Sequence, residues 1–293
     1  MIDFFIGVDG GGSGTRVRLA RADGVEIAEG AGGPSALLHG INNAWAAVDA
    51  AAAQAFRNAS IGSDFPARAR IAIGLGLAGV HNKQWAADFV AANPGYAQVA
   101  LESDGHTTVL GAHAGQPGAI IALGTGSVGE IKLADGRHVE VGGWGFPSGD
   151  EAGGAWMGLR AINHVQQVLD GRMPANAFAS DVARACGDAG DRNAVQHWLG
   201  HATQTTYAQL ARIVLQHGES DDTARAILLD AGRQVQLMAD ALDASGTLPI
   251  ALCGGLAAPL RPYLPVSMLK RIVNPRGDSA AGALRLIQSR LKE

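Results

Sequence analysis

The sequence predicts an α/β protein built from two similar halves. An apolar run ends at Asp9 and passes into the glycine-rich residues 10–14, and a second apolar run passes into the glycines and hydroxyl residues of 124–129. Each turn is followed by strand-like residues that flank an Asp-Gly pair, Asp23-Gly24 and Asp135-Gly136, which is typical of a tight hairpin. Each half therefore opens with a β-meander that contains a glycine turn, and the chain looks duplicated.

The elements of the first half alternate between helices and strands. Helical spacing of apolar residues predicts helices over 42–59 and 83–92, and a further helix from 107 to 114. Continuous apolar runs predict buried strands over 70–77 and 98–101. This alternation indicates a sheet that is at least partly parallel, with crossover connections.

The second half is expected to begin after residues 115–118, which contain glycine and proline. We expect an N-terminal domain over 1–116 and a larger C-terminal domain over 117–277. Residues 155–242 are mainly helical by their spacing, and a short strand over 249–252 ends in glycines. A closing helix is expected over about 278–293.

Composition bounds the class of protein. The 293 residues are 47% hydrophobic and carry a net charge of −4, and no run of Lys or Arg occurs, which argues against a nucleic-acid-binding surface. Two cysteines, Cys186 and Cys253, are too few for a disulfide framework or a cysteine-based metal site. No stretch approaches the ~20 apolar residues of a membrane span, and the first residues lack a secretion signal. A soluble cytoplasmic protein is the expectation.

The two glycine turns suggest phosphate binding. Glycine lets backbone N–H groups crowd around an anion without a Cβ in the way, and Asp9 at the strand end could bind Mg²⁺, directly or through water. Glycine-rich turns also occur in purely structural hairpins, and the recurrence of the motif is what favours phosphate. The candidate nucleotide-binding residues of the two turns are Gly10, Gly11, Gly12, Ser13, Thr15, Gly124, Thr125, Gly126 and Ser127.

A resemblance narrows this interpretation. The paired turns are similar to the two phosphate loops of the superfamily of actin, the sugar kinases and the heat-shock chaperone ATPases. Over nearly the whole chain, an ordered series of short motifs resembles the N-acetylglucosamine kinase and glucosamine kinase family. The series comprises residues 8–13, 102–105, 124–127, 142–145, 149–151 and 253–255.

The resemblance implies a fold and an activity. The fold would be two duplicated ribonuclease H-like (actin-like ATPase) domains with a nucleotide cleft between them, the closing helix packing back on the first. The activity would be transfer of the γ-phosphoryl group from ATP, with Mg²⁺, to the 6-hydroxyl of N-acetylglucosamine, or of glucosamine. A small-molecule amino sugar would be the substrate, and a homodimer is expected by analogy.

Asp104 is the candidate catalytic base. It follows a predicted strand, at the end where open α/β sheets place ligands. In the family, the matching aspartate takes the proton from the sugar 6-hydroxyl and so also contacts the substrate. The alternative is a helix N-cap, because aspartate before Thr107 and Thr108 would cap well.

Further site residues follow from the resemblance. Gly143, Trp144, Gly145 and Asp150 match the sugar-binding segment, where an indole packs on sugar C–H groups and a carboxylate binds hydroxyls. Gly254 and Gly255 match the adenosine-contacting turn, and Ser279 would lie near the adenine base of the nucleotide. The early sugar loop contains Ser35, but Ala36 stands where family members often have asparagine. This departure leaves open whether the substrate is N-acetylglucosamine or glucosamine. The sequence also leaves open whether Glu151 contacts substrate or metal.

Three rival interpretations stay open at this stage. Residues 74–79 match the dinucleotide fingerprint and would indicate a nicotinamide-dependent oxidoreductase, although the acidic candidates lie beyond the ~20 residues expected. A non-catalytic ATP-binding module would bind nucleotide without sugar-dependent turnover. Related ATPase activators of radical dehydratases carry an iron–sulfur cluster on cysteines, and the distant Cys186 and Cys253 argue against that branch.

Overall fold

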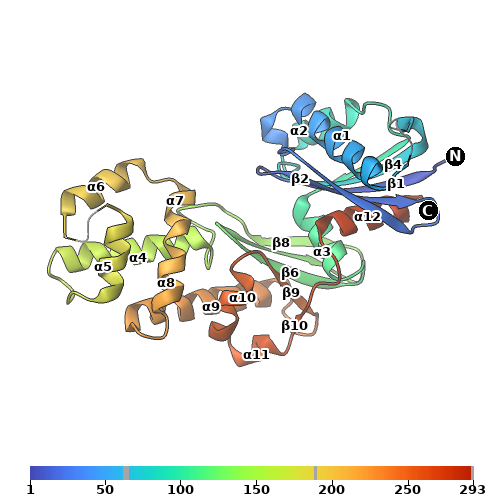
Figure 1. Ribbon diagram of the computed structural model, residues 1–293. Coiled ribbons are helices and arrows are strands. Elements are labelled where there is room, and N and C mark those ends of the chain that lie inside the picture. The colour runs from blue at the N-terminus through green and yellow to red at the C-terminus, as the bar shows by residue number, and fades with distance from the viewer. Residues whose placement is uncertain (62–65, 188–189, 292–293) are drawn as a thin grey trace. The chain divides into compact units, whose positions relative to one another are not determined.

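The computed structural model describes residues 1–61, 66–187 and 190–291, and it divides the chain into two compact units (Figure 1). Unit 1 comprises Met1–Gly118, Ile131–His138 and Asn274–Glu293, and unit 2 comprises Ala119–Glu130 and Val139–Val273. The domain limits expected from the sequence stay a prediction, and residues 292–293 of the expected closing helix lie outside the described residues.

The two units share one sheet topology. Unit 1 holds a five-stranded sheet in the order β3 (Glu26–Gly32), β2 (Thr15–Arg21), β1 (Phe4–Gly10), β4 (Ile71–Leu77) and β5 (Gln98–Glu102). The sheet of unit 2 has the order β8 (His138–Gly142), β7 (Ser127–Lys132), β6 (Gly118–Leu123), β9 (Ile250–Cys253) and β10 (Ile272–Val273). In unit 1, β2 runs antiparallel to β1 while β4 and β5 run parallel to it; in unit 2, β9 is parallel to β6 and β10 to β9. The predicted α/β class and the duplication of a β-meander followed by crossover strands are confirmed.

The elements of unit 1 lie close to their predicted ranges. Its strands are β1 (Phe4–Gly10), β2 (Thr15–Arg21), β3 (Glu26–Gly32), β4 (Ile71–Leu77) and β5 (Gln98–Glu102). Its helices are η1 (Leu37–His39), α1 (Ile41–Asn58), η2 (Arg68–Arg70), α2 (Lys83–Ala91), α3 (Asp104–Ala112) and α12 (Ser279–Arg290).

The two faces of the unit 1 sheet are covered by different helices (Figure 1). Ile6 and Val8 of β1 are fully buried in a core that includes Trp45 of α1, because alternate residues of a strand point to one face. The opposite face carries Phe5 and, on α12, Ile287. Helix α12 thus lies against the sheet although it is the last element of the chain.

Glycines let the backbone of α12 pack directly against the backbones of the sheet and of α3. Gly7 and Gly74 are register partners in β1 and β4, and a Cβ on either would overlap backbone atoms of α12. On the helix itself, a Cβ at Gly282 would overlap the carbonyl oxygen of Thr107 in α3. We infer that these positions are glycine because no side chain fits between the packed backbones.

The nicotinamide interpretation of residues 74–79 is wrong. Gly74 and Gly76 lie inside β4 and not in a turn between a strand and a helix. The space of a Cβ at Gly76 is taken by the side chain of Thr107. The spacing of Gly74 and Gly76 reflects close packing of helices on a strand.

Unit 2 adds a helical part to its sheet, as the spacing of residues 155–242 predicted. Its strands are β6 (Gly118–Leu123), β7 (Ser127–Lys132), β8 (His138–Gly142), β9 (Ile250–Cys253) and β10 (Ile272–Val273). Its helices are α4 (Gly154–Leu169), α5 (Ala177–Ala185), α6 (Arg192–His201), α7 (Gln204–Gln209), α8 (Ala211–His217), α9 (Asp222–Leu242), α10 (Ala257–Leu260), η3 (Arg261–Tyr263) and α11 (Val266–Leu269).

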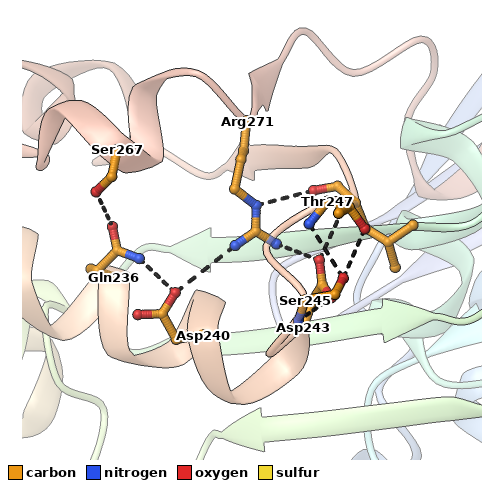
Figure 2. A network of polar contacts seen from close by, with 8 residues as sticks. Gln236, Asp240, Asp243, Ser245, Thr247, Ser267 and Arg271 are labelled. Atoms are coloured by element: carbon orange, nitrogen blue, oxygen red, sulfur yellow. Dashed lines mark hydrogen bonds and ion pairs between the residues drawn. The ribbon is translucent and has the colours of Figure 1, made fainter.

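A buried ion pair fixes the end of α9 beside β9 and β10 (Figure 2). The Arg271 guanidinium donates to the Asp243 carboxylate (2.8 Å) and to the carbonyl of Leu248 (3.2 Å), and Asp240 lies 3.9 Å away. The side chains of Arg271 and Asp243 are 10% and 7% exposed. Removal of one partner would leave a buried charge, so this network holds the start of β9 firmly.

No helix in the described parts of the chain is both long and apolar enough to cross a lipid bilayer.

Candidate functional site

The first glycine turn connects β1 to β2 and is held by its own backbone. The N–H of Gly11 donates to the carbonyl of Gly14 (3.0 Å), and the carbonyl of Gly11 accepts from the N–H groups of Ser35 and Ala36 (3.1 and 3.2 Å). A Cβ built on Gly11 or Gly12 would meet no atom of a described residue within 4 Å. Hydrogen bonds at Gly11 therefore hold the turn in place, while the space beside Gly11 and Gly12 stays open. Binding of an anion by backbone N–H groups requires such open space.

Thr15 and Ser35 lie in the interior beneath this turn. The Thr15 hydroxyl is 2.7 Å from the Ser35 hydroxyl and 2.6 Å from the carbonyl of Gly33, and both side chains are buried. A Cβ at Gly10 would overlap Ser35. The structure thus shows both hydroxyls supporting the turn, and their contacts with nucleotide and sugar stay predictions.

Asp9 lies at the end of β1, where it faces Arg16 of β2 across the antiparallel ladder. Their side chains form an ion pair with an N–O distance of 3.1 Å. Burial raises the pKa of Asp9; Arg16 and a hydrogen bond from Ser279 act to lower it, and the negative charge of Asp104 raises it further. These influences place Asp9, Asp104 and Ser279 in one corner of unit 1.

Asp104 is the first residue of α3, and the N-cap is Ser103. The Ser103 hydroxyl accepts from the N–H of His106 (3.0 Å), which is the bond that an N-cap side chain makes. The alternative interpretation of Asp104 as the cap is therefore wrong, and the helix begins three residues before the predicted Thr107. Within the described residues, the Asp104 carboxylate accepts only from the N–H of Gly105 (3.1 Å). Because Ser103 caps the helix, the Asp104 carboxylate is available to bind a substrate or a proton.

Ser279 belongs to the same corner as Asp104. Its hydroxyl is 2.8 Å from the Thr107 hydroxyl and 3.4 Å from the carbonyl of Asp104. The hydroxyls of Thr107 and Thr108 also bond this carbonyl (3.1 and 2.6 Å). The start of α12 thus fixes the backbone of Asp104. Ser279 lies in unit 1, whereas Gly254 and Gly255 belong to unit 2.

The second glycine turn is fixed on the first turn of α4. The N–H of Gly124 donates to the carbonyl of Gly126 (2.9 Å), and the N–H groups of Gly154 and Ala155 donate to the carbonyls of Gly124 and Thr125 (2.8 and 2.9 Å). The Ser127 hydroxyl donates to the carbonyl of Glu151 (2.5 Å). A helix start normally has unsatisfied N–H groups, and here the turn satisfies two of them and is held in place.

Asp150 lies against this second turn in a left-handed backbone conformation, with φ of +58°. One carboxylate oxygen accepts from the N–H of Gly145 (3.2 Å) and the other from the side-chain amide of Gln204 (2.8 Å). A Cβ at Gly126 would overlap the same carboxylate. Strained residues of this kind concentrate at functional sites. The predicted Asp150, Gly126 and Gly145 are therefore brought together.

Trp144 projects from this segment into solvent. Its side chain is 84% exposed, which is unusual for a large aromatic residue. Gly143 and Gly145 on either side have φ of +70° and +85°, and a Cβ at Gly149 would lie 2.7 Å from the Cβ of Trp144. The glycines thus permit the backbone that displays the indole.

Gly254 and Gly255 follow β9 and lie beside the second turn. Gly254 has φ of +88°, and a Cβ there would overlap the carbonyl of Leu123, the residue before Gly124. That carbonyl accepts from the N–H of Leu256 (3.0 Å). Since β6 and β9 are parallel neighbours, the turn at Gly124 after β6 and the turn at Gly254 after β9 emerge at the same edge of the unit 2 sheet.

Sequence reasoning missed two residues of the site: Gln204, which donates to Asp150, and Ser103, which caps α3. Gln204 lies 54 residues after Asp150, and no local pattern links the two. Ser103 did carry a signal, because serine before a helical run is a preferred N-cap.

Comparisons with known proteins agree with this geometry. The chain is 50% identical to a crystal structure from Chromobacterium violaceum, described as a candidate N-acetylglucosamine kinase, with a TM-score of 0.89 and coverage of 98% of this chain and 99% of the other. It is 32% identical over 286 residues to the glucosamine kinase GspK of Vibrio cholerae serotype O1, covering 97% of this chain and 95% of the relative. An N-acetylmuramic acid/N-acetylglucosamine kinase of Clostridium acetobutylicum is 24% identical, with 98% of both chains covered.

The relatives are kinases, and the resemblance seen in the sequence is confirmed, as is the actin-like ATPase fold with its use of ATP. The enzyme class is a phosphotransferase with an alcohol group as acceptor. Residues 6–284 match the BadF/BadG/BcrA/BcrD ATPase family, and the chain belongs to that family.

Proposed function

We propose that this protein is an amino-sugar kinase that transfers the γ-phosphoryl group of ATP to the 6-hydroxyl of N-acetylglucosamine. The observation that carries the proposal is Asp104, a carboxylate at the start of α3 whose capping duty has passed to Ser103. Phosphoryl transfer requires positioned phosphates and a group that accepts the proton of the attacking hydroxyl. Asp104 would take that proton.

The sugar would be held by residues of unit 2. The exposed indole of Trp144 offers a flat apolar face for sugar C–H groups, and the Asp150 carboxylate, already fixed by Gly145 and Gln204, would accept hydrogen bonds from sugar hydroxyls. Gly143 and Gly145 would bring backbone groups close to the ring. Ser35 of unit 1 would act mainly through the turn that it supports.

The nucleotide would be bound by the glycine turns. The turns at residues 10–13 and 124–127 would cradle the phosphates through those backbone N–H groups that make no bond within the turn, and the turn at Gly254 and Gly255 would contact adenosine. The Asp9 corner fits a magnesium ion, because Asp9 and Asp104 are close enough to interact electrostatically and carboxylates are the hard oxygen ligands that Mg²⁺ prefers. A bound Mg²⁺ would neutralise phosphate charge, and Asp9 would hold it directly or through water.

Glucosamine is the second candidate acceptor. The curated relative at 32% identity is named a glucosamine kinase, whereas the structural relative at 50% identity is described as a candidate N-acetylglucosamine kinase. Ala36, which replaces the asparagine of the family loop, is buried and has no polar group for an acetamide. The cytoplasm as location and a homodimer as assembly remain part of the proposal.

A coupled ADP-release assay with ATP and Mg²⁺ tests the proposal. N-acetylglucosamine, glucosamine, glucose and N-acetylmannosamine would be compared, with the Asp104→Asn variant as control. We expect turnover with an amino sugar that the variant loses. Binding of ATP without turnover on any sugar would contradict the proposal and favour a non-catalytic ATP-binding module.

A further inference from the structure

Gln204 is the polar side chain that holds the Asp150 carboxylate from outside its own loop. Its amide nitrogen is 2.8 Å from one carboxylate oxygen, while the N–H of Gly145 is 3.2 Å from the other. An ionised carboxylate only accepts hydrogen bonds, so the amide must turn its NH₂ group toward Asp150. The two bonds together define the plane of the carboxylate.

Helix α7, which carries Gln204, is itself fixed at three points. Thr203 caps it in a reciprocal capping box with Thr206. The carbonyl of Tyr207 packs so closely on α4 that a Cβ at Gly158 would overlap it. The Tyr207 ring lies 5.0 Å from the ring of Phe146, two residues after Trp144. Gln204 therefore extends from a rigid support, and α7 braces the segment that contains Asp150.

Asp150 needs such support because its backbone is strained. A non-glycine residue with φ of +58° persists only where its surroundings fix it. Its carboxylate also lies against Gly126 of the second glycine turn, where no side chain would fit. A rotation of this carboxylate would disturb the sugar contact and press on the turn.

We propose that Gln204 is a positioning residue for the sugar, which orients the Asp150 carboxylate so that its remaining lone pairs face the substrate. This inference rests on the proposed function, because it assigns Gln204 to the same sugar site. Gln204 acts through Asp150 and does not itself react. It would therefore affect sugar binding much more than nucleotide binding.

The test uses the full chain with Gln204→Ala and Gln204→Met, which both remove the donor, and with Gln204→Glu. Gln209→Ala, at the exposed end of the same helix, is the matched control. A hydrogen bond to a charged group corresponds to roughly a 10-fold effect or more. We expect KM for the amino sugar to rise about 10-fold in the first two variants, with KM for ATP within about 2-fold of the unchanged chain.

Gln204→Glu adds a readout that a purely structural role would not give. Two facing carboxylates can share a proton at low pH and repel each other once that proton is lost. We therefore expect kcat/KM for the sugar to fall as pH rises in this variant, along a limb that the unchanged chain and Gln209→Ala lack.

The outcomes separate the inference from the function on which it rests. No sugar turnover by the unchanged chain would overturn both. An active unchanged chain with the same sugar KM in Gln204→Ala and Gln204→Met would overturn the role of Gln204 alone. Equal rises in KM for sugar and ATP, without the new pH limb, would assign Gln204 to general support of the fold and would also overturn it.

Discussion

Replacing Asp104 by asparagine removes a proton acceptor while keeping the size of the side chain. The carboxylate accepts only from Gly105 among the described residues, and the helix cap is Ser103, so the fold loses little. Loss of one negative charge at a helix start costs roughly 0.3–1 kcal/mol. Loss of a general base costs roughly 10²–10⁴-fold in rate. We therefore expect a folded protein with almost no kinase activity.

Ser103→Ala is the matched control, because it removes the helix cap and keeps the Asp104 carboxylate. It removes the hydroxyl that accepts from His106, and loss of an N-cap costs about 1 kcal/mol of unfolding free energy. For a domain of this size, that lowers Tm by roughly 2–4 °C. The Asp104 carboxylate is kept, so most of kcat should remain.

The assay measures kcat by ADP release and Tm by circular dichroism for both variants. We expect the two effects to separate, with Asp104→Asn losing rate and Ser103→Ala losing stability. If Asp104→Asn kept more than about a tenth of the rate, Asp104 would not be the base. If it instead lost stability as Ser103→Ala does, its role would be structural.

Three further predictions concern stability, pH and sugar binding. Gly282→Ala should lower Tm by several degrees, because its Cβ would overlap the α3 backbone, whereas Gly200→Ala in open space should leave Tm unchanged or slightly higher; equal Tm values would refute the packing argument. Burial, with the neighbouring His106, lowers the pKa of His138 to about 4 from 6.5, so the native state binds this proton less tightly than the unfolded chain. Urea titrations should show stability, complete above about pH 6.5, falling as pH decreases toward 4, and a flatter dependence in His138→Phe; the same slope in both would contradict it. Trp144→Ala should raise the sugar KM about 10-fold with little change in Tm, since the indole is exposed and its removal leaves no cavity; an unchanged KM would exclude it from the site.

The sequence was informative wherever a local pattern determines the structure. The Asp-Gly pairs at Asp23 and Asp135 form turns with Gly24 and Gly136 at φ of +86° and +85°, because the pair favours that backbone. The strands and helices of unit 1 lie within a few residues of their predicted ranges for the same reason. The duplicated topology followed from the order of these elements.

Contacts between distant residues could not be predicted in the same way. The bond between Gln204 and Asp150 and the ion pair between Arg271 and Asp243 join residues that only the folded chain brings together. The dinucleotide-like spacing at Gly74 and Gly76 misled for a related reason. A closely packed backbone requires glycine just as a bound phosphate does, and the sequence pattern is the same in both cases.

The position of α12 has a consequence for the order in which the protein is made. A ribosome adds about 5–20 residues per second, so the segment that completes the unit 1 sheet face emerges roughly 10–30 s after residue 118. During that time Gly7, Gly74 and the apolar residues around them have no helix to cover them. Unit 2, together with residues 131–138 of unit 1, is synthesised in this interval, before the last segment of unit 1. A nascent chain therefore needs to keep an uncovered glycine-lined face from aggregating until its last helix arrives.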